Sequence, residues 1–263
     1  MLHHVLDGPA DAPVVLLLGS LGSDLSMWDA QVPGLAGPFR VLRADLRGHG
    51  GSPVPPGPYG LDDLVDDVLA LLDGLGVPRV HAVGLSLGGM VAMRLAAREP
   101  ARVDRLAVLC SSARMDPGPW RERAALVRAQ GTGAIAATVV GRWLTPAGRE
   151  AGLVARLEAM VAATPDAGYA ACCEAIAGLD LRPDLPRIAA PTLALAADGD
   201  PATPPADLAA IAAGVPGGRL VVVPDGAHLV NIERTAAVNA ALLAHLLGSP
   251  PPDGPTRVHD PGS

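Results

Sequence analysis

The chain has 263 residues, of which 49% are hydrophobic and only 2% aromatic, and its formal net charge at pH 7 is −7. This length suits one large domain or one domain with an insertion, and its core must consist mainly of Ala, Leu and Val. The acidic balance argues against a nucleic-acid partner or an anionic membrane surface, because both need clustered Lys and Arg.

Cysteine usage and the first residues indicate the compartment. Cys110, Cys172 and Cys173 are odd in number and lack the spacing of a metal site, which favours reduced cysteines that pack in the core. The opening MLHHVLDG has neither the basic nor the apolar stretch of a signal peptide, and no apolar run approaches the roughly 18 residues of a membrane span. We therefore expect a soluble cytoplasmic protein.

Apolar runs that end in glycine-rich loops mark the expected strands of the first half. A short leading strand is expected within 2–8, and the continuous apolar run 14–18 is typical of a parallel strand covered on both faces. The strand 40–46 leads into the loop 47–52, which lacks the Gly-Lys-Ser/Thr of a phosphate-binding loop. Residues 61–75 predict an amphipathic helix with an acidic outer face.

The segment 80–98 carries the strongest chemical signal. Its centre, Gly84-Leu85-Ser86-Leu87-Gly88, matches the G-x-S-x-G turn that exposes a nucleophilic serine, and it lies between an expected strand, 80–84, and an apolar helix, 87–98. The glycines leave room for a crowded turn, and the first N–H groups of the helix point toward a developing oxyanion. In a chain with 31 glycines the pattern can occur by chance, but its strand–turn–helix context favours catalysis.

In the second half of the chain, expected strands and helices alternate again, with one all-helical segment between them. Expected strands at 103–110, 191–197 and 220–223, with helices at 204–213 and 231–247, complete a mostly parallel, doubly wound α/β sheet. Between them, 113–181 reads as an inserted helical lid, while 1–112 and 182–248 form the core and 249–263 a disordered tail. Trp120, Trp143 and Tyr169 in the lid form either an apolar ceiling for a small substrate or contacts between lid helices.

A serine nucleophile needs a base and an orienting carboxylate, which in this fold follow it at the ends of later strands. Of the seven histidines, only His228 lies in a loop after the last expected strand and outside the termini. Asp200, Asp198 and Asp116 all follow strands, and the rigid Asp-Pro-Ala-Thr-Pro setting favours Asp200, with Asp198 in reserve. His49, in a loop at the rim, is a candidate for substrate contact.

Segments along nearly the whole chain resemble the α/β-hydrolases and, among them, the 3-oxoadipate enol-lactonases. The hydrolase segments 47–50, 84–90, 200–205 and 227–229 are also typical of esterases, haloperoxidase-like enzymes and C–C hydrolases. The lid segments RWLTP at 142–146 and GYAACC at 168–173 are more specific, and 20–24, 27–29 and 56–59 agree with them. Two positions depart from the family pattern: Gly19, where Asn is more usual, and Thr235, where Pro is common.

The resemblance implies hydrolysis of 3-oxoadipate enol-lactone to 3-oxoadipate in the protocatechuate branch of aromatic catabolism, the β-ketoadipate pathway. Ser86, Asp200 and His228 are the implied catalytic triad, and the backbone N–H groups of Leu21 and Leu87 are the expected oxyanion hole. No metal or organic cofactor is implied.

The substrate is an anionic lactone, so a local cation or donor is expected to bind its carboxylate. Trp143 and Arg142 in the lid are candidates, and Trp28 is a candidate wall of the site. Three alternatives stay open: a general carboxylesterase, a C–C bond hydrolase, and a ligand-binding relative without catalysis. The oligomeric state is not indicated.

Overall fold

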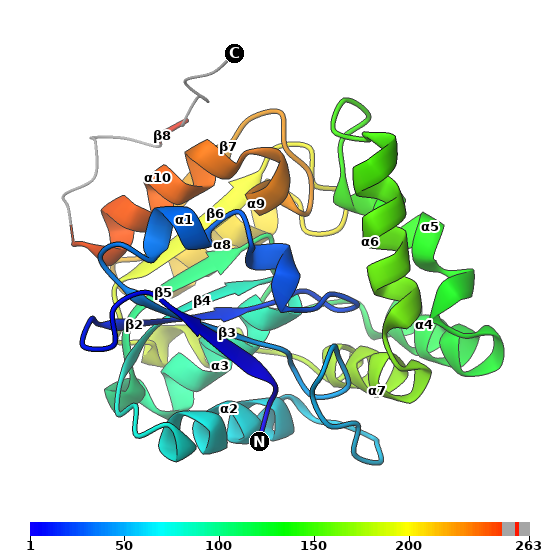
Figure 1. Cartoon of the computed structure of the whole chain (residues 1–263), viewed down its shortest axis with the longest axis horizontal. Helices are drawn as coiled ribbons and strands as arrows, with labels where there is room; N and C mark the ends of the chain where they lie inside the picture. Colours follow the sequence, from blue (N-terminus) through cyan, green and yellow to red (C-terminus); the bar gives the residue numbers. More distant parts are fainter. Residues whose placement is uncertain (249–255, 258–263) are drawn as a thin grey trace.

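The computed structural model describes residues 1–248 and 256–257, whose centre is an eight-stranded sheet (Figure 1). Along the sheet the strands follow the order β1-β3-β2-β4-β5-β6-β7-β8, and in the described part of the chain only β1 runs antiparallel to its neighbour. The strands are β1 (His4–Asp7), β2 (Val14–Leu18), β3 (Arg40–Ala44), β4 (Val80–Leu85), β5 (Val103–Leu109), β6 (Thr192–Ala197), β7 (Arg219–Val223) and β8 (Thr256–Arg257). The predicted α/β class with a mostly parallel sheet is confirmed.

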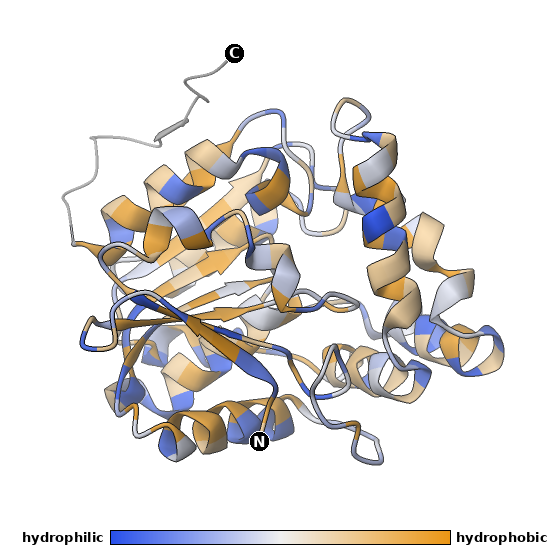
Figure 2. Ribbon diagram, viewed as in Figure 1, coloured by the Kyte–Doolittle hydropathy of each residue, from blue (hydrophilic) through white to orange (hydrophobic). Residues whose placement is uncertain are grey.

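Helices cover both faces of this sheet (Figure 1). On one face lie α2 (Leu61–Gly74) and α3 (Leu87–Arg98), which pack against each other, and on the other lie α1 (Val32–Leu35) and α10 (Thr235–Leu246). A further helix, α8 (Pro205–Gly214), packs on β6 and β7. Strands β4 and β6 are buried along their whole length and consist mainly of hydrophobic residues (Figure 2), as is typical of parallel strands between two helical layers.

Between β5 and β6 the chain forms a separate helical layer. It consists of α4 (Pro117–Gln130), α5 (Ala136–Trp143), α6 (Ala151–Ala163) and α7 (Asp166–Ala177), which gather at the right of Figure 1. An isolated bridge between Arg114 and Asp180 joins the two ends of this segment. The remaining short helices are η1 (Leu25–Trp28), η2 (Pro100–Arg102), η3 (Thr132–Ala134), η4 (Leu185–Arg187) and α9 (Val230–Glu233).

The single helix predicted for 231–247 is wrong, because the structure has two helices, α9 and α10, separated at Arg234. The backbone of Arg234 has φ −126° and ψ 48°, outside the helical region. The hydroxyl of Thr235 donates to the carbonyls of Asn231, at 2.9 Å, and Ile232, at 3.1 Å. These bonds satisfy carbonyl groups at the end of α9, so the helix can end there.

The C-terminal segment predicted to be disordered, 249–263, lies outside the described residues except for Thr256–Arg257, which pair with Val221–Val222 of β7. Within residues 1–248 and 256–257, no helix has the length and apolar character needed to cross a membrane. The same residues contain no cluster of three or more His, Cys, Asp or Glu able to hold a metal ion.

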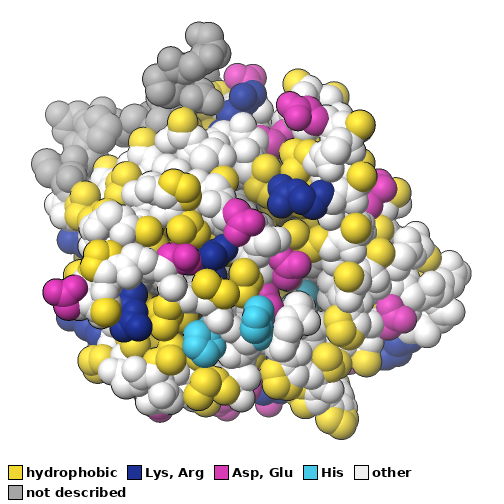
Figure 3. All heavy atoms as spheres, in the orientation of Figure 1, with side chains coloured by type: hydrophobic (Ala, Val, Ile, Leu, Met, Phe, Trp, Pro, Cys, Tyr) yellow, Lys and Arg dark blue, Asp and Glu magenta, His cyan; other side chains and the backbone are white. Residues whose placement is uncertain are grey.

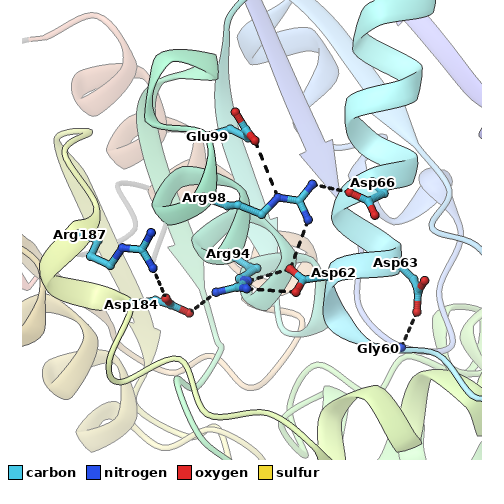
Figure 4. Close-up of polar contacts among 9 residues, drawn as sticks. All are labelled: Gly60, Asp62, Asp63, Asp66, Arg94, Arg98, Glu99, Asp184 and Arg187. Carbon is cyan, nitrogen blue, oxygen red and sulfur yellow. Dashed lines mark hydrogen bonds and ion pairs between the residues drawn. The ribbon is translucent and has the colours of Figure 1, made fainter.

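An ion-pair network holds α3 against α2 and against the chain that leads into β6 (Figure 4). Arg94 of α3 lies 2.8 Å from Asp62 of α2 and 2.8 Å from Asp184, and Arg98 pairs with Asp62 and Asp66. The hydrogen bond to Asp62 raises the pKa of Arg94. Single exposed pairs contribute little, but this network joins three segments, one of which is the helix that directly follows Ser86.

Burial of His245 makes the stability of the fold depend on pH. His245 of α10 donates through Nε2 to the carbonyl of Leu106 at 2.9 Å, and burial lowers its pKa to about 4. The unfolded chain takes up this proton near the ordinary pKa of about 6.5, whereas the folded chain takes it up only near 4. The stability due to neutral His245 is therefore complete above pH 6.5, and about 3 kcal/mol of it is lost as the pH falls toward 4.

Urea unfolding between pH 8 and pH 4 measures this effect. We expect His245→Gln, which keeps a donor for the Leu106 carbonyl and does not titrate, to flatten the decline below pH 6.5 while leaving the range from pH 7 to 8 unchanged. An equally steep decline in the variant would contradict the assignment.

Candidate active site

Ser86 occupies a constrained turn between β4 and α3. Its φ is 56° and its ψ −116°, a conformation that is costly for a residue with a Cβ and that surrounding contacts must maintain. Its N–H donates to the carbonyl of Leu109 at 3.0 Å, and the hydroxyl of Ser111 donates to its carbonyl at 2.8 Å. The end of strand β5 and the residues just after it therefore hold both the N–H and the carbonyl of the serine.

The two glycines of the turn allow α3 to approach the sheet. A Cβ on Gly84 would lie 2.1 Å from the carbonyl oxygen of Gly88, and one on Gly88 would lie 2.1 Å from the carbonyl oxygen of Leu18. Both obstacles are backbone atoms of packed elements, which cannot rotate away. The expectation that glycine is needed here for space is confirmed.

Gly88→Ala is therefore expected to destabilise the fold by about 3 kcal/mol or more, because an added methyl group overpacks the contact between α3 and β2. The matched control is Gly152→Ala in α6, where a Cβ meets nothing within 4 Å. That change should stabilise the protein by about 0.5–1 kcal/mol through helix propensity. Urea unfolding of both variants measures the difference, and equal stabilities would refute the steric argument.

Asp200 and His228 come together from the loops that follow β6 and β7. His228 Nδ1 lies 2.8 Å from Asp200 Oδ2, and both residues are buried. Asp200 also accepts hydrogen bonds from the Thr203 hydroxyl at 2.6 Å and from the N–H groups of Ala202 at 2.8 Å and Thr203 at 3.2 Å. Burial by itself would raise the pKa of Asp200, but the charge of His228 and these hydrogen bonds outweigh burial and lower it. The carboxylate therefore stays ionised and orients the imidazole.

The other acidic candidates lie elsewhere. Asp198 is exposed, and its side chain makes no hydrogen bond within residues 1–248 and 256–257. Asp116 caps the N-terminus of α4 by accepting the N–H of Gly118 at 3.1 Å. Of the three, only Asp200 contacts His228 in the described part of the chain.

Ser86 and His228 line one cavity of about 190 Å³, beneath the helices α4, α5 and α7. No hydrogen bond joins the Ser86 hydroxyl to His228 in the described residues, which is common before a substrate draws such groups together. From the sheet side the cavity is lined by Ser20, Leu21, Ser86, Met90, Pro201, Ala202, Thr203 and His228. From the helical side it is lined by Met115, Asp116, Pro119, Trp120, Arg123, Val139, Arg142, Trp143 and Tyr169.

The lid aromatics Trp120, Trp143 and Tyr169 all line this cavity, so of the two alternatives for them the structure favours a ceiling. Arg142 also lines it, although its side chain is largely exposed. Trp28 is not brought to the cavity, and its expected role as a wall is wrong. The indole of Trp28 is fully buried in the hydrophobic core, on η1.

The two residues whose N–H groups are expected to bind an oxyanion both belong to segments that reach the cavity. Leu87 is the first residue of α3, and Leu21 lines the cavity from the loop after β2. A hydrogen bond of 2.9 Å from the N–H of Gly88 to the carbonyl of Gly19 joins this loop to the start of α3. Within the part of the chain that the structure describes, the N–H groups of Leu21 and Leu87 donate to no protein group.

His49 supports the loop after β2 and does not line the cavity, contrary to its expected contact with substrate. Its Nε2 accepts the N–H of Gly22 at 2.9 Å, and its Nδ1 lies 3.1 Å from the carbonyl of Arg47, so Nδ1 carries the proton. Burial lowers the pKa of His49, which favours this neutral form. The signal that could have revealed this role is the turn-forming Arg-Gly-His-Gly after a strand.

Glu233 is a residue that the sequence reasoning missed. Its Oε2 accepts the N–H of Ala227, beside His228, at 2.7 Å, and its Oε1 accepts the N–H and hydroxyl of Thr145 at 2.8 and 2.7 Å. The N–H of Leu229 also donates to the carbonyl of Trp143 at 2.9 Å. One carboxylate thus joins the histidine loop to the lid segment that carries Trp143.

Comparisons with known proteins agree with this geometry. The model of the alpha/beta hydrolase fold family matches residues 13–235. The chain is 38% identical to 3-oxoadipate enol-lactonase 2 of Acinetobacter baylyi over 92% of each chain. It is 34% identical, over 93% of this chain and 96% of the other, to a Variovorax paradoxus protein provisionally named carbamate hydrolase RutD. The crystal structure of the enol-lactonase from Burkholderia xenovorans LB400 is 41% identical, covers 94% of this chain and 96% of its own, and superposes with a TM-score of 0.91.

Proposed function

Since the chain belongs to the α/β-hydrolase family, we propose that it is a serine hydrolase that opens 3-oxoadipate enol-lactone to 3-oxoadipate, in the β-ketoadipate pathway of aromatic catabolism. The observation that carries the reaction type is the buried Asp200–His228 pair, 2.8 Å apart, on the same cavity as Ser86 in its constrained turn. The substrate is supported by the enol-lactonases among the relatives.

In the proposed mechanism His228 accepts the proton of the Ser86 hydroxyl as Oγ attacks the lactone carbonyl. The oxyanion of the tetrahedral intermediate accepts hydrogen bonds from the N–H groups of Leu21 and Leu87, each worth about 3–4 kcal/mol in comparable sites. Collapse of the intermediate breaks the ring C–O bond, and the released enolate takes the proton from His228 and ketonises. A water molecule that gives its proton to His228 then hydrolyses the acyl-enzyme and restores Ser86.

The charge of the cavity supports an anionic substrate. The net charge of −7 opposes the approach of an anion, and on the face drawn in Figure 3 basic and acidic side chains are interspersed. Attraction must therefore be local, and two arginines, Arg123 and Arg142, line the cavity. Its volume of about 190 Å³ is below the roughly 300–1,000 Å³ of pockets for drug-sized ligands, which favours a small acid.

The test is a substrate panel with the purified full chain. Carboxymuconolactone decarboxylase generates the enol-lactone in the cuvette, and its loss is followed by ultraviolet absorbance. We expect kcat/KM for the lactone to exceed that for p-nitrophenyl acetate and for ethyl carbamate by about 100-fold or more. A higher kcat/KM for the acetate would indicate a general esterase, and a higher value for the carbamate would favour the function suggested by the name of the Variovorax relative.

A further inference from the structure

A hydrogen-bond donor without an acceptor marks one wall of the cavity. The side chain of Tyr169 is fully buried and lines the cavity, yet its hydroxyl proton has no acceptor within the described residues, since the guanidinium of Arg123 beside it is itself a donor. Buried hydroxyl groups in native proteins nearly always have their hydrogen bonds satisfied, so an unpaired donor on a residue that lines a cavity points to a ligand atom as the missing acceptor. Burial raises the pKa of Tyr169, so its hydroxyl keeps the proton that it would donate.

The position of Tyr169 is fixed by close backbone packing. A Cβ on Gly168 would lie 2.4 Å from the Cα of Gly48, so α7 lies directly against the loop after β3. The ring of Tyr169 in turn packs against Gly22, where an added Cβ would lie 2.9 Å from Cε2. The hydroxyl therefore has a defined direction, set by contacts between the lid and the core.

A guanidinium group lies on the same wall. Arg123 of α4 lines the cavity, is half-buried and stacks on Trp120, with its Cζ 4.6 Å from the ring centroid. Its positive charge lies close enough to Tyr169 to oppose the effect of burial on the pKa of that hydroxyl. In the described part of the chain Arg123 makes no ion pair. Its planar donors are therefore held by stacking on Trp120 and by the contact with the Tyr169 hydroxyl, and the donors that this contact does not use remain available.

We propose that Arg123 and the hydroxyl of Tyr169 form a carboxylate-binding subsite, which holds the acid group of the substrate while its lactone carbonyl faces Ser86. This inference rests on the proposed function for the identity of the substrate. Guanidinium and phenol groups are both donors, and a carboxylate accepts several charge-assisted hydrogen bonds at once. The largely exposed Arg142 is the weaker candidate, and Asp116, the one carboxylate among the described cavity residues, already caps α4.

Kinetics with charged and neutral substrates test the subsite. Arg123→Met is expected to lower kcat/KM for the enol-lactone about 100-fold and Tyr169→Phe about 10-fold, mainly through KM. For the neutral ester p-nitrophenyl acetate, which has no carboxylate, the loss of kcat/KM in each variant should be several-fold smaller than its loss for the lactone. Arg123→Lys, which keeps the charge, should recover part of the loss. The matched control is Arg121→Met, an exposed arginine of the same helix that does not line the cavity.

A binding readout separates this inference from the proposed function. Glutarate is added as an inert carboxylate while p-nitrophenyl acetate is hydrolysed, and its inhibition constant is measured. Competitive inhibition that weakens at least tenfold in Arg123→Met supports the subsite, even if the enol-lactone is not a substrate. Equal effects of Arg123→Met on the lactone and the neutral ester, or inhibition by glutarate that does not depend on Arg123, would overturn the subsite while leaving lactone hydrolysis intact.

Discussion

Ser86→Ala is expected to lower kcat for the enol-lactone by about 10⁶-fold, the loss seen when the nucleophile of a serine triad is removed. Binding should change little, because Ala removes only the hydroxyl and the cavity keeps its other lining residues. The fold should also persist. Alanine has the same Cβ as serine, so the backbone at φ 56° is no more strained, and the bonds from Ser86 N–H to Leu109 and from Ser111 to the Ser86 carbonyl remain.

The matched control for Ser86→Ala is Ser112→Ala. Ser112 is a buried serine near the end of β5, and its hydroxyl donates to the carbonyl of Arg114 at 2.7 Å, outside the cavity lining. Its loss should change kcat/KM by less than about tenfold, and unfolding curves should show both variants folded. If Ser86→Ala retains more than about 1% of the original kcat, Ser86 is not the nucleophile.

The turn around Ser86 could be predicted because its determinants are local. The pattern of glycines, a β-branched strand and an apolar helix predicted the helix over 87–98, and the structure has α3 as Leu87–Arg98. The run 14–18 likewise coincides with β2, Val14–Leu18. Most residues of both segments are buried, so the sequence carries a strong apolar signal there that needs no knowledge of distant residues.

What could not be predicted depends on contacts between segments far apart in the chain. Glu233 reads as an ordinary helix residue, and only the fold brings Thr145 within 2.8 Å of it. His49 reads as a rim residue, but its partner Gly22 precedes it by 27 positions. From the sequence, Trp28 is expected to form a wall of the site, but only the fold shows that its indole is fully buried in the hydrophobic core.

In the lid, the sequence does not show which side of each helix faces the cavity. Arg142 and Trp143 are neighbours in sequence, so on α5 they point about 100° apart, and burial of Trp143 leaves Arg142 largely exposed. A sequence motif that contains both residues does not show which one faces the ligand. Arg123, outside that motif, is half-buried and stacked beside the cavity.

Asp200→Asn is expected to lower kcat by about 10⁴-fold, as in serine proteases whose triad aspartate is replaced. The N–H groups of Ala202 and Thr203 donate to Oδ1 of Asp200, so an asparagine would keep its oxygen there and place its NH₂ group at the position of Oδ2. That NH₂ group would donate to His228 Nδ1, which then becomes the acceptor. The proton of the imidazole would move to Nε2, and the ring could no longer take a proton from Ser86.

The control that isolates this effect is Asp198→Asn, two residues away in the same loop. The Asp198 side chain is exposed and makes no hydrogen bond in the described part of the chain, while its N–H donates to Val223 at 3.1 Å and is unaffected by the change. Its kcat should stay within about twofold of the unchanged protein, since surface substitutions seldom alter a buried site. Both variants have the same change in charge, so a general electrostatic effect would slow them equally. A loss of less than tenfold in Asp200→Asn, or an equal loss in Asp198→Asn, would remove Asp200 from the triad.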